Sequence, residues 1–323
     1  MAFDFSAVTA PFRMQPGLRR LAPGALQLTP NVLADAALAA KLSVLSQHAH
    51  QALLRVPGFD AAPALQALAD HAAAAHPDAF AVRGPAHWHA PRLGWSVHDG
   101  SVAGNGPPAL GDCLRALPPA WRGAALLSLA FAEDFALLDG ATGCVPWLAV
   151  CLPSHWAPED KVGRHFAQIH APVADNQTLL TASEHLVRLV TGSDRWERFV
   201  WTITGDPALD RHPARCTPTR WPAEADADAD ADAEADAESI AESAWFRTER
   251  QTFIPVAGHA QAIFTIHVEV RALADAVASA AQARQLHAAL STMSAEVLAY
   301  RGLTDARARL VAWLAARAGA APP

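Results

Sequence analysis

The chain has 323 residues, of which 51% are hydrophobic and 18% charged, a composition typical of a globular protein with a substantial core. No uninterrupted apolar run reaches the roughly 18 residues of a membrane span, and the first residues lack the basic and apolar regions of a secretory signal. We therefore expect a cytoplasmic protein. The net charge of −7 argues against a nucleic-acid partner, which would require a concentrated basic surface.

Much of the negative charge lies in an alternating Ala-Asp/Glu repeat, which places eight acidic residues between Glu224 and Glu238. The rest of the chain is nearly neutral. Because such a repeat has little to bury, we expect residues 222–243 to form an acidic disordered loop inserted in a single domain that spans residues 1–323. A calcium site is the alternative, but the repeat lacks the glycine turn of a calcium loop.

Hydrophobic spacing in the first half of the chain predicts helices that precede a strand-rich middle. Breaks at glycine and proline predict short strands and loops over residues 77–110. Residues 125–131 suit a strand or a helix equally. In chain order the other predicted elements are helices over 31–54 and 62–75, and strands over 135–139 and 147–152.

In the second half, long strands are predicted between helices. The expected elements are helices over 158–171 and 179–191, a strand over 199–204, a hairpin of strands 245–253 and 262–270, and helices over 275–290 and 304–318. This order favours an α+β fold over a repeating βαβ pattern.

The sequence contains no dinucleotide fingerprint, P-loop, H-E-x-x-H or G-x-S-x-G motif. The four cysteines match no zinc template, which predicts reduced, structural thiols. Among the 15 histidines, His87 and His89 could share one face of a strand and contact a metal or substrate, although a surface or packing role is favoured.

On the predicted helix over 158–171, His170 falls on the apolar face with Phe166 and Ile169. A histidine there would suit a flat hydrophobic cofactor such as haem, with imidazole as the axial ligand. Periodicity alone favours a hydrogen-bonded core histidine.

The strand around Arg247, Glu249, Arg250 and Gln251 carries charges in a segment with strand character. Buried charges require partners. An internal Arg–Glu ion pair and an arginine bound to a carboxylate such as a haem propionate are equally compatible with this pattern.

Five stretches occur in an order that resembles the haem-dependent oxidative N-demethylases, also called the dimethylamine monooxygenase α-subunit type. They are Ala10-Pro-Phe-Arg-Met-Gln-Pro-Gly-Leu, Cys151-Leu-Pro-Ser-His-Trp-Ala-Pro-Glu-Asp-Lys-Val-Gly, Ile169-His-Ala-Pro-Val, Arg247-Thr-Glu-Arg-Gln-Thr-Phe and Phe264-Thr-Ile. The chain departs from the family pattern at Ala174, Phe253 and the region around Trp201.

The resemblance implies a PAS-like antiparallel sheet core with flanking helices. It implies haem b, molecular oxygen, and electrons from NADPH through a separate reductase that carries FMN and an iron–sulfur cluster. The implied reaction is oxidative N-demethylation of a small methylated amine, with release of formaldehyde.

By the same resemblance, His170 is the expected axial ligand of the haem iron, with His165 as the fallback. Arg247, Glu249, Arg250, Gln251 and Lys161 are expected near the haem or its propionates. Two other classes remain open: a PAS-like sensor that binds haem or a small ligand without turnover, and a protein in which His170 only packs in the core.

Overall fold

The computed structural model describes residues 3–217, 221–222 and 230–319. Its longest strands, β10 (Trp245–Pro255) and β11 (Gln261–Ala272), pair antiparallel over their whole lengths, from Trp245 opposite Ala272 to Pro255 opposite Ala262. Between Thr265 and Arg271, β11 alternates β-branched apolar residues with polar ones, a pattern that fits a pleated surface. The predicted hairpin is therefore confirmed.

This hairpin is the centre of a seven-stranded antiparallel sheet in the order β1-β9-β10-β11-β7-β8-β2. The remaining strands are β1 (Arg19–Arg20), β2 (Leu53–Arg55), β7 (Asp134–Asp139), β8 (Trp147–Ala149) and β9 (Trp196–Thr204). Residues 77–110 contain the predicted short strands and loops, and the four strands form a separate antiparallel meander. Its strands are β3 (Ala81–Gly84), β4 (His87–Ala90), β5 (Trp95–His98) and β6 (Ser101–Gly104).

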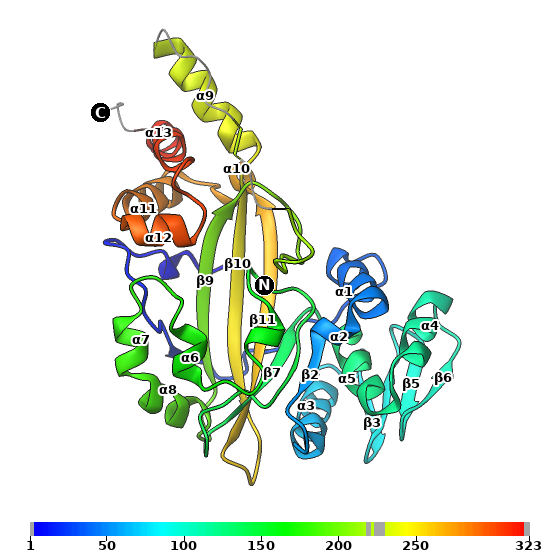
Figure 1. Ribbon diagram of the computed structural model, residues 1–323. Helices are drawn as coiled ribbons and strands as arrows, with labels where there is room; N and C mark the ends of the chain where they lie inside the picture. The colour runs from blue at the N-terminus through cyan, green and yellow to red at the C-terminus, as the bar shows by residue number, and fades with distance from the viewer. Residues whose placement is uncertain (1–2, 218–220, 223–229, 320–323) are drawn as a thin grey trace.

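Helices pack on both sides of the large sheet (Figure 1). On one side lie α1 (Ala36–Gln47), α2 (Ala49–Ala52), α3 (Ala62–Ala75), α4 (Pro108–Ala116) and α5 (Pro119–Ala130), together with the small sheet. Beside β9 lie α6 (Phe166–His170), α7 (Gln177–Thr181) and α8 (Ser183–Val190).

The C-terminal helices gather at one end of the sheet (Figure 1). They are α9 (Asp230–Glu242), α10 (Leu273–Ala276), α11 (Ala280–Ser291), α12 (Ala295–Tyr300) and α13 (Arg307–Arg317). Two short 3₁₀ helices, η1 (Phe5–Ala7) and η2 (Pro158–Asp160), complete the described elements. None of the described helices is both long and apolar enough to cross a bilayer.

The largest hydrophobic cluster joins the two sheets, because it includes Trp88 and Trp95 of the small sheet and Ile263 and Ile266 of the large one. A second cluster lies among the C-terminal helices, and the single domain over residues 1–323 stays a prediction. The fold is thus α+β, with antiparallel sheets and flanking helices, as expected.

The predicted helix over 158–171 is wrong in its first half. Only η2 and the five-residue α6 are helical there, and Gly163 between them has a φ of +76°. Residues 163–166 instead run beside 143–145, where Gly163 donates to the Val145 carbonyl and Phe166 to that of Gly143. A left-handed glycine and these pairings end the helical path.

The acidic segment also differs from expectation. Residues 223–229 lie outside the described part, but residues 230–242 form α9 rather than a disordered loop. Its C-terminal half is anchored: Ile240 and Ala241 are buried in a cluster with Leu310 and Trp313 of α13, and the Trp313 indole donates to Glu238. The apolar residues Ile240 and Ala241, which follow the acidic repeat, give the C-terminal half of α9 an apolar face that packs in the core.

Candidate functional site

A cavity of about 560 Å³ lies on one face of the large sheet. The sheet residues that line it are paired across neighbouring strands, with Gln251 between Arg198 and Ile266, Glu249 opposite Val200, and Phe253 opposite Phe264. Directly opposed residues point to the same side, so one face of β7, β8, β9, β10 and β11 forms the floor. The volume falls within the range of cofactor and small-ligand pockets.

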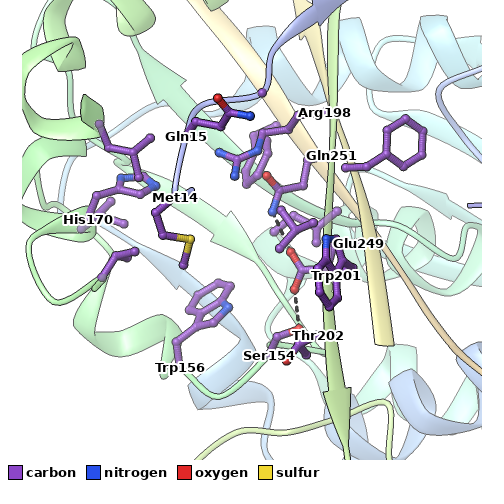
Figure 2. Close-up of a pocket in the computed structure, with 18 of the residues that line it drawn as sticks. Met14, Gln15, Ser154, Trp156, His170, Arg198, Trp201, Thr202, Glu249 and Gln251 are labelled. Atoms are coloured by element: carbon purple, nitrogen blue, oxygen red, sulfur yellow. Dashed lines mark hydrogen bonds between the residues drawn. The ribbon is translucent and has the colours of Figure 1, made fainter. Parts of the chain in front are cut away.

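Segments outside the sheet form the walls. One wall is the loop Ser154, His155 and Trp156, and another is α6 with Ile169 and His170. Figure 2 shows His170 and Trp156 on one side of the cavity, across from Glu249 and Gln251 on β10. The lining surface is mostly apolar but includes charged and polar side chains, which suits a hydrophobic cofactor that carries charged groups.

His170 is the last residue of α6, and its ring is held by that helix. Its Nδ1 lies 2.8 Å from the Phe166 carbonyl oxygen, and the two rings are 4.1 Å apart. Since a carbonyl only accepts, Nδ1 carries the proton and Nε2 keeps its lone pair. No described residue bonds to Nε2. Burial lowers the pKa of His170 to about 4, so the imidazole is neutral near pH 7.

The fallback ligand His165 has a different role. Its Nδ1 accepts from the Ala167 amide at 3.1 Å, and the Gln168 side chain accepts from the His165 amide, which makes His165 the N-cap of α6 in a reciprocal capping box. Its ring packs against Gly143 and does not line the cavity.

Lys161, Glu249 and Gln251, which the resemblance places near a haem, all line the cavity. Burial lowers the pKa of Lys161, whose ammonium donates to the Ile169 carbonyl at 3.3 Å. Glu249 is held at both oxygens: Oε1 accepts from the Ser154 hydroxyl and Oε2 accepts from the Gln251 amide at 2.6 Å.

Arg247 lies behind this pair rather than in the cavity. Its guanidinium donates to the Ala208 and Leu209 carbonyls at 2.9 Å each, and its Nε donates to the Ser154 hydroxyl at 2.8 Å. Only 1% of Arg247 is exposed, and burial lowers its pKa to about 10, which leaves it charged at neutral pH. Hydrogen bonds therefore connect four side chains in a row: Arg247 to Ser154, Ser154 to Glu249, and Gln251 to Glu249.

Arg250 is not brought to the cavity. Strand alternation turns it to the opposite face of the sheet, where it pairs with Glu197 at 3.0 Å and donates to the Leu26 carbonyl. Arg250 therefore does not line this cavity, although the resemblance places it near the haem or its propionates. Arg250 instead forms the Arg–Glu ion pair that the sequence left open, although with a glutamate on β9.

The sequence analysis did not identify Arg198 on β9, a cationic residue of the site. Arg198 lines the cavity, its Nε is buried, and no hydrogen bond or ion pair joins it to any described residue. Burial lowers the pKa of this guanidinium, while the charge of Glu249 opposes the shift. A buried cation without a partner is costly, so this group favours an anionic ligand.

The N-terminal segment is a further missed wall. Phe12, Met14 and Gln15 line the cavity. The Arg301 guanidinium lies 4.6 Å from the centroid of the Phe12 ring, contacts the Met14 sulfur and donates to the Trp201 carbonyl at 2.6 Å. The stretch Phe12-Arg-Met-Gln-Pro-Gly was noticed in the sequence, but nothing in its pattern indicates where it packs.

The pair His87 and His89 lies elsewhere, on β4 of the small sheet. His87 stacks on His98 with ring centroids 4.3 Å apart, and Nδ1 of His89 bonds to Ser96. Across the described residues there is no group of three or more His, Cys, Asp or Glu side chains that could hold a metal ion.

The cavity therefore fits a flat, largely apolar cofactor with anionic groups. It offers one neutral imidazole with a free lone pair. Five cationic side chains are among its lining residues, of which Arg19 is already paired with Asp4 and Glu197; the others are Arg13, Lys161, Arg198 and Arg301. Glu249 is the single carboxylate among the described lining residues. A haem has these features, with two propionates and an iron that takes imidazole nitrogen. The lining of the cavity is therefore compatible with a haem-like cofactor.

A family model described as haem-dependent oxidative N-demethylase, alpha subunit-like, matches residues 35–311. The chain belongs to this family. A comparison with curated proteins gave no match. The match begins after the N-terminal segment that closes one side of the cavity.

Proposed function

We propose that this chain is the haem-binding component of a monooxygenase that demethylates a small methylated amine such as dimethylamine. The cofactor is haem b held in a PAS-like sheet core, and molecular oxygen is the cosubstrate. Electrons come from NADPH through a separate reductase subunit with FMN and an iron–sulfur cluster. The family membership and the geometry of His170 support this proposal.

The observation that carries the proposal is the fixed tautomer of His170. Ligating histidines usually donate their second ring nitrogen to a carbonyl or carboxylate, which orients the ring and makes the free nitrogen a better ligand. The bond from Nδ1 to the Phe166 carbonyl supplies this arrangement. Burial keeps the imidazole neutral, so a metal has no proton to displace.

The other lining residues have complementary roles. Arg198 and Lys161 would bind the propionates, because both are partly buried cations that line the cavity. Trp156, Phe166 and Phe264 would pack against the faces and edges of the ring and exclude water. When bound, the haem supplies the oxidation chemistry that no side chain can perform.

The visible absorption spectrum of the haem-supplemented protein tests the proposal. A Soret band that shifts on reduction and with carbon monoxide is expected, and it should be lost in His170→Ala but retained in His165→Ala. Both variants should keep the wild-type circular dichroism. A folded His170→Ala protein with an unchanged Soret band would contradict the ligand assignment.

Turnover separates the enzyme from a haem-binding sensor. Formaldehyde release from dimethylamine, dependent on NADPH and an added reductase of the stated type, is expected. A haem-loaded protein that binds the amine but releases no formaldehyde with any competent electron donor would favour the sensor.

A further inference from the structure

The N-terminal segment lies against both faces of the large sheet. Phe12 and Arg19 line the cavity on one face, and β1 pairs with β9 at the edge of the sheet. Beyond β1 the chain crosses to the opposite face, where Arg250 donates to the Leu26 carbonyl at 2.8 Å. We call residues 12–31 the N-terminal clasp, because they contact the sheet on both faces.

We propose that Glu133 and His267 form a proton-sensitive latch for the N-terminal clasp, and that loss of a proton from Glu133 loosens the clasp and the cavity wall that it forms. His267 follows Ile266, which lines the cavity, so strand alternation turns His267 to the opposite face of the sheet. The inference goes beyond the proposed function, since it does not depend on which ligand fills the cavity.

The first argument is the contact between Glu133 and the clasp. Glu133 lies between α5 and β7, and only 1% of it is exposed. Its Oε2 accepts from the Thr29 amide at 2.9 Å, and the Thr29 carbonyl accepts from the Ala132 amide at the same distance. The other carboxyl oxygen, Oε1, is buried and has no hydrogen bond to any described residue. Glu133 therefore anchors the clasp through an incompletely bonded carboxyl group.

The second argument is the group that faces this free oxygen. Nδ1 of His267 lies 3.5 Å from Glu133 Oε1 and 3.5 Å from the Thr29 hydroxyl. Burial lowers the pKa of His267 to about 4, so its imidazole is neutral near pH 7. A protonated Glu133 can donate to Nδ1, whereas an ionised Glu133 faces a neutral ring. A buried carboxylate without a cation is costly, which favours the protonated form.

The third argument is that the surrounding charges are already bonded. The other charged or titratable groups of this layer are Lys41 on α1, His76 on α3, Asp134 on β7 and Arg250 on β10. Lys41 pairs with Asp134 at 3.1 Å, and Arg250 pairs with Glu197 at 3.0 Å. His76 bonds to a backbone carbonyl of the clasp at 2.8 Å, and burial lowers its pKa. None of these contacts places a cation on Glu133 Oε1.

The direction of the pH effect follows from this burial. Burial raises the pKa of Glu133 from the ordinary value of 4.5 to about 7 while the clasp is closed. Opening exposes the carboxyl to water and returns its pKa toward 4.5. The stabilisation of the closed clasp by this group is therefore complete below pH 4.5 and is lost as the pH rises through about 7. The opening constant should rise about tenfold between roughly pH 6 and pH 8.5.

Hydrogen exchange of the full chain, followed by mass spectrometry at about pH 6 and pH 8.5, tests the inference. Protection factors remove the intrinsic pH dependence of exchange. In wild type, protection of residues 21–31 and of residues 12–20 should fall about tenfold at the higher pH. Glu133→Gln keeps the shape of the protonated acid but cannot ionise, so its protection in both segments should stay within about twofold.

The matched control is Glu184→Gln on α8, where the side chain is 82% exposed, and it should behave as wild type. A second variant, His267→Gln, should show a smaller fall than wild type, because its amide can donate to the ionised Oε1. An equal fall in wild type and Glu133→Gln, or no fall in wild type, would overturn the inference. A fall confined to residues 21–31 would overturn the link to the cavity wall. Because the readout involves neither haem nor an amine, the proposed function stands or fails separately.

Discussion

His170 and the carbonyl oxygen of Phe166, one helical turn before it, are joined by a hydrogen bond of 2.8 Å from Nδ1. The bond lies within the five-residue helix α6, so the helix itself sets the orientation of the ring. The Phe166 ring, tilted by 35° with its centroid 4.1 Å from that of His170, packs against the imidazole and reinforces that orientation. The result is a neutral imidazole with its lone pair available in the cavity.

The pH dependence of haem affinity follows from this neutrality. Burial lowers the pKa of His170 from 6.5 to about 4, so protons do not compete with the iron until the pH approaches that value. The Kd for haem, measured from the Soret band, should be nearly constant from pH 8 to pH 5. A histidine with an ordinary pKa would weaken binding about tenfold for each pH unit below 6.5. That steeper profile would contradict a neutral, buried ligand.

Arg198 should affect the empty and the loaded protein in opposite directions. Arg198→Leu removes a buried cation that no described residue pairs, and should stabilise the haem-free protein by about 1–3 kcal/mol in denaturant unfolding. The same change should weaken haem binding about tenfold to a hundredfold, because a charge-assisted bond to a propionate is lost. Arg188→Leu on α8, with an exposed side chain, should change neither quantity much. Loss of stability together with unchanged haem affinity would indicate a structural role for Arg198.

Ser154 should contribute to stability through the two charged residues that it joins. Ser154→Ala removes the hydroxyl that joins Arg247 to Glu249, and should lower the free energy of unfolding by about 1–3 kcal/mol because both charged groups lose a partner. Ser154→Thr should restore much of the stability because it returns the hydroxyl. Urea unfolding of the three proteins checks this. An equal loss in the alanine and threonine variants would point to packing at this position instead of the hydroxyl.

The parts of this site differ in how visible they are in the sequence. The position of His170 beside Phe166 and Ile169 is visible in the sequence. The helix predicted over 158–171 is too long, because pairing with residues 143–145 sets the conformation of Gly163. The sequence marked the charged segment of β10 as a candidate, and strand alternation places Glu249 and Gln251 on the cavity face and Arg250 on the other.

Arg198 was out of reach of such reasoning. It lies on β9 in a segment without a motif, and its place beside Gln251 depends on the register between β9 and β10, which is a long-range property. The walls formed by Met14 and Arg301 also depend on long-range packing, because these contacting residues are 287 positions apart in the sequence.

Local periodicity predicted whole elements where packing agreed with it. Helix α3 spans Ala62–Ala75, as the spacing indicates, and residues 125–131, which suited two structures, lie mostly in the buried helix α5. The prediction of a disordered loop for the acidic repeat relied on composition alone, and residues 230–242 are helical. The apolar residues at its end, Ile240 and Ala241, had a partner surface on α13 that only the folded chain reveals.

Helix α9 gives the last prediction. Ile240 is fully buried against the α13 cluster, so Ile240→Ala should lower the free energy of unfolding by about 2–5 kcal/mol. Glu242→Ala, two residues further along the same helix at an exposed position, should stay within about 0.5 kcal/mol of wild type. Urea unfolding followed by circular dichroism measures both. If the two substitutions had the same small effect, α9 would be a solvated segment and its packing on α13 would contribute nothing to stability.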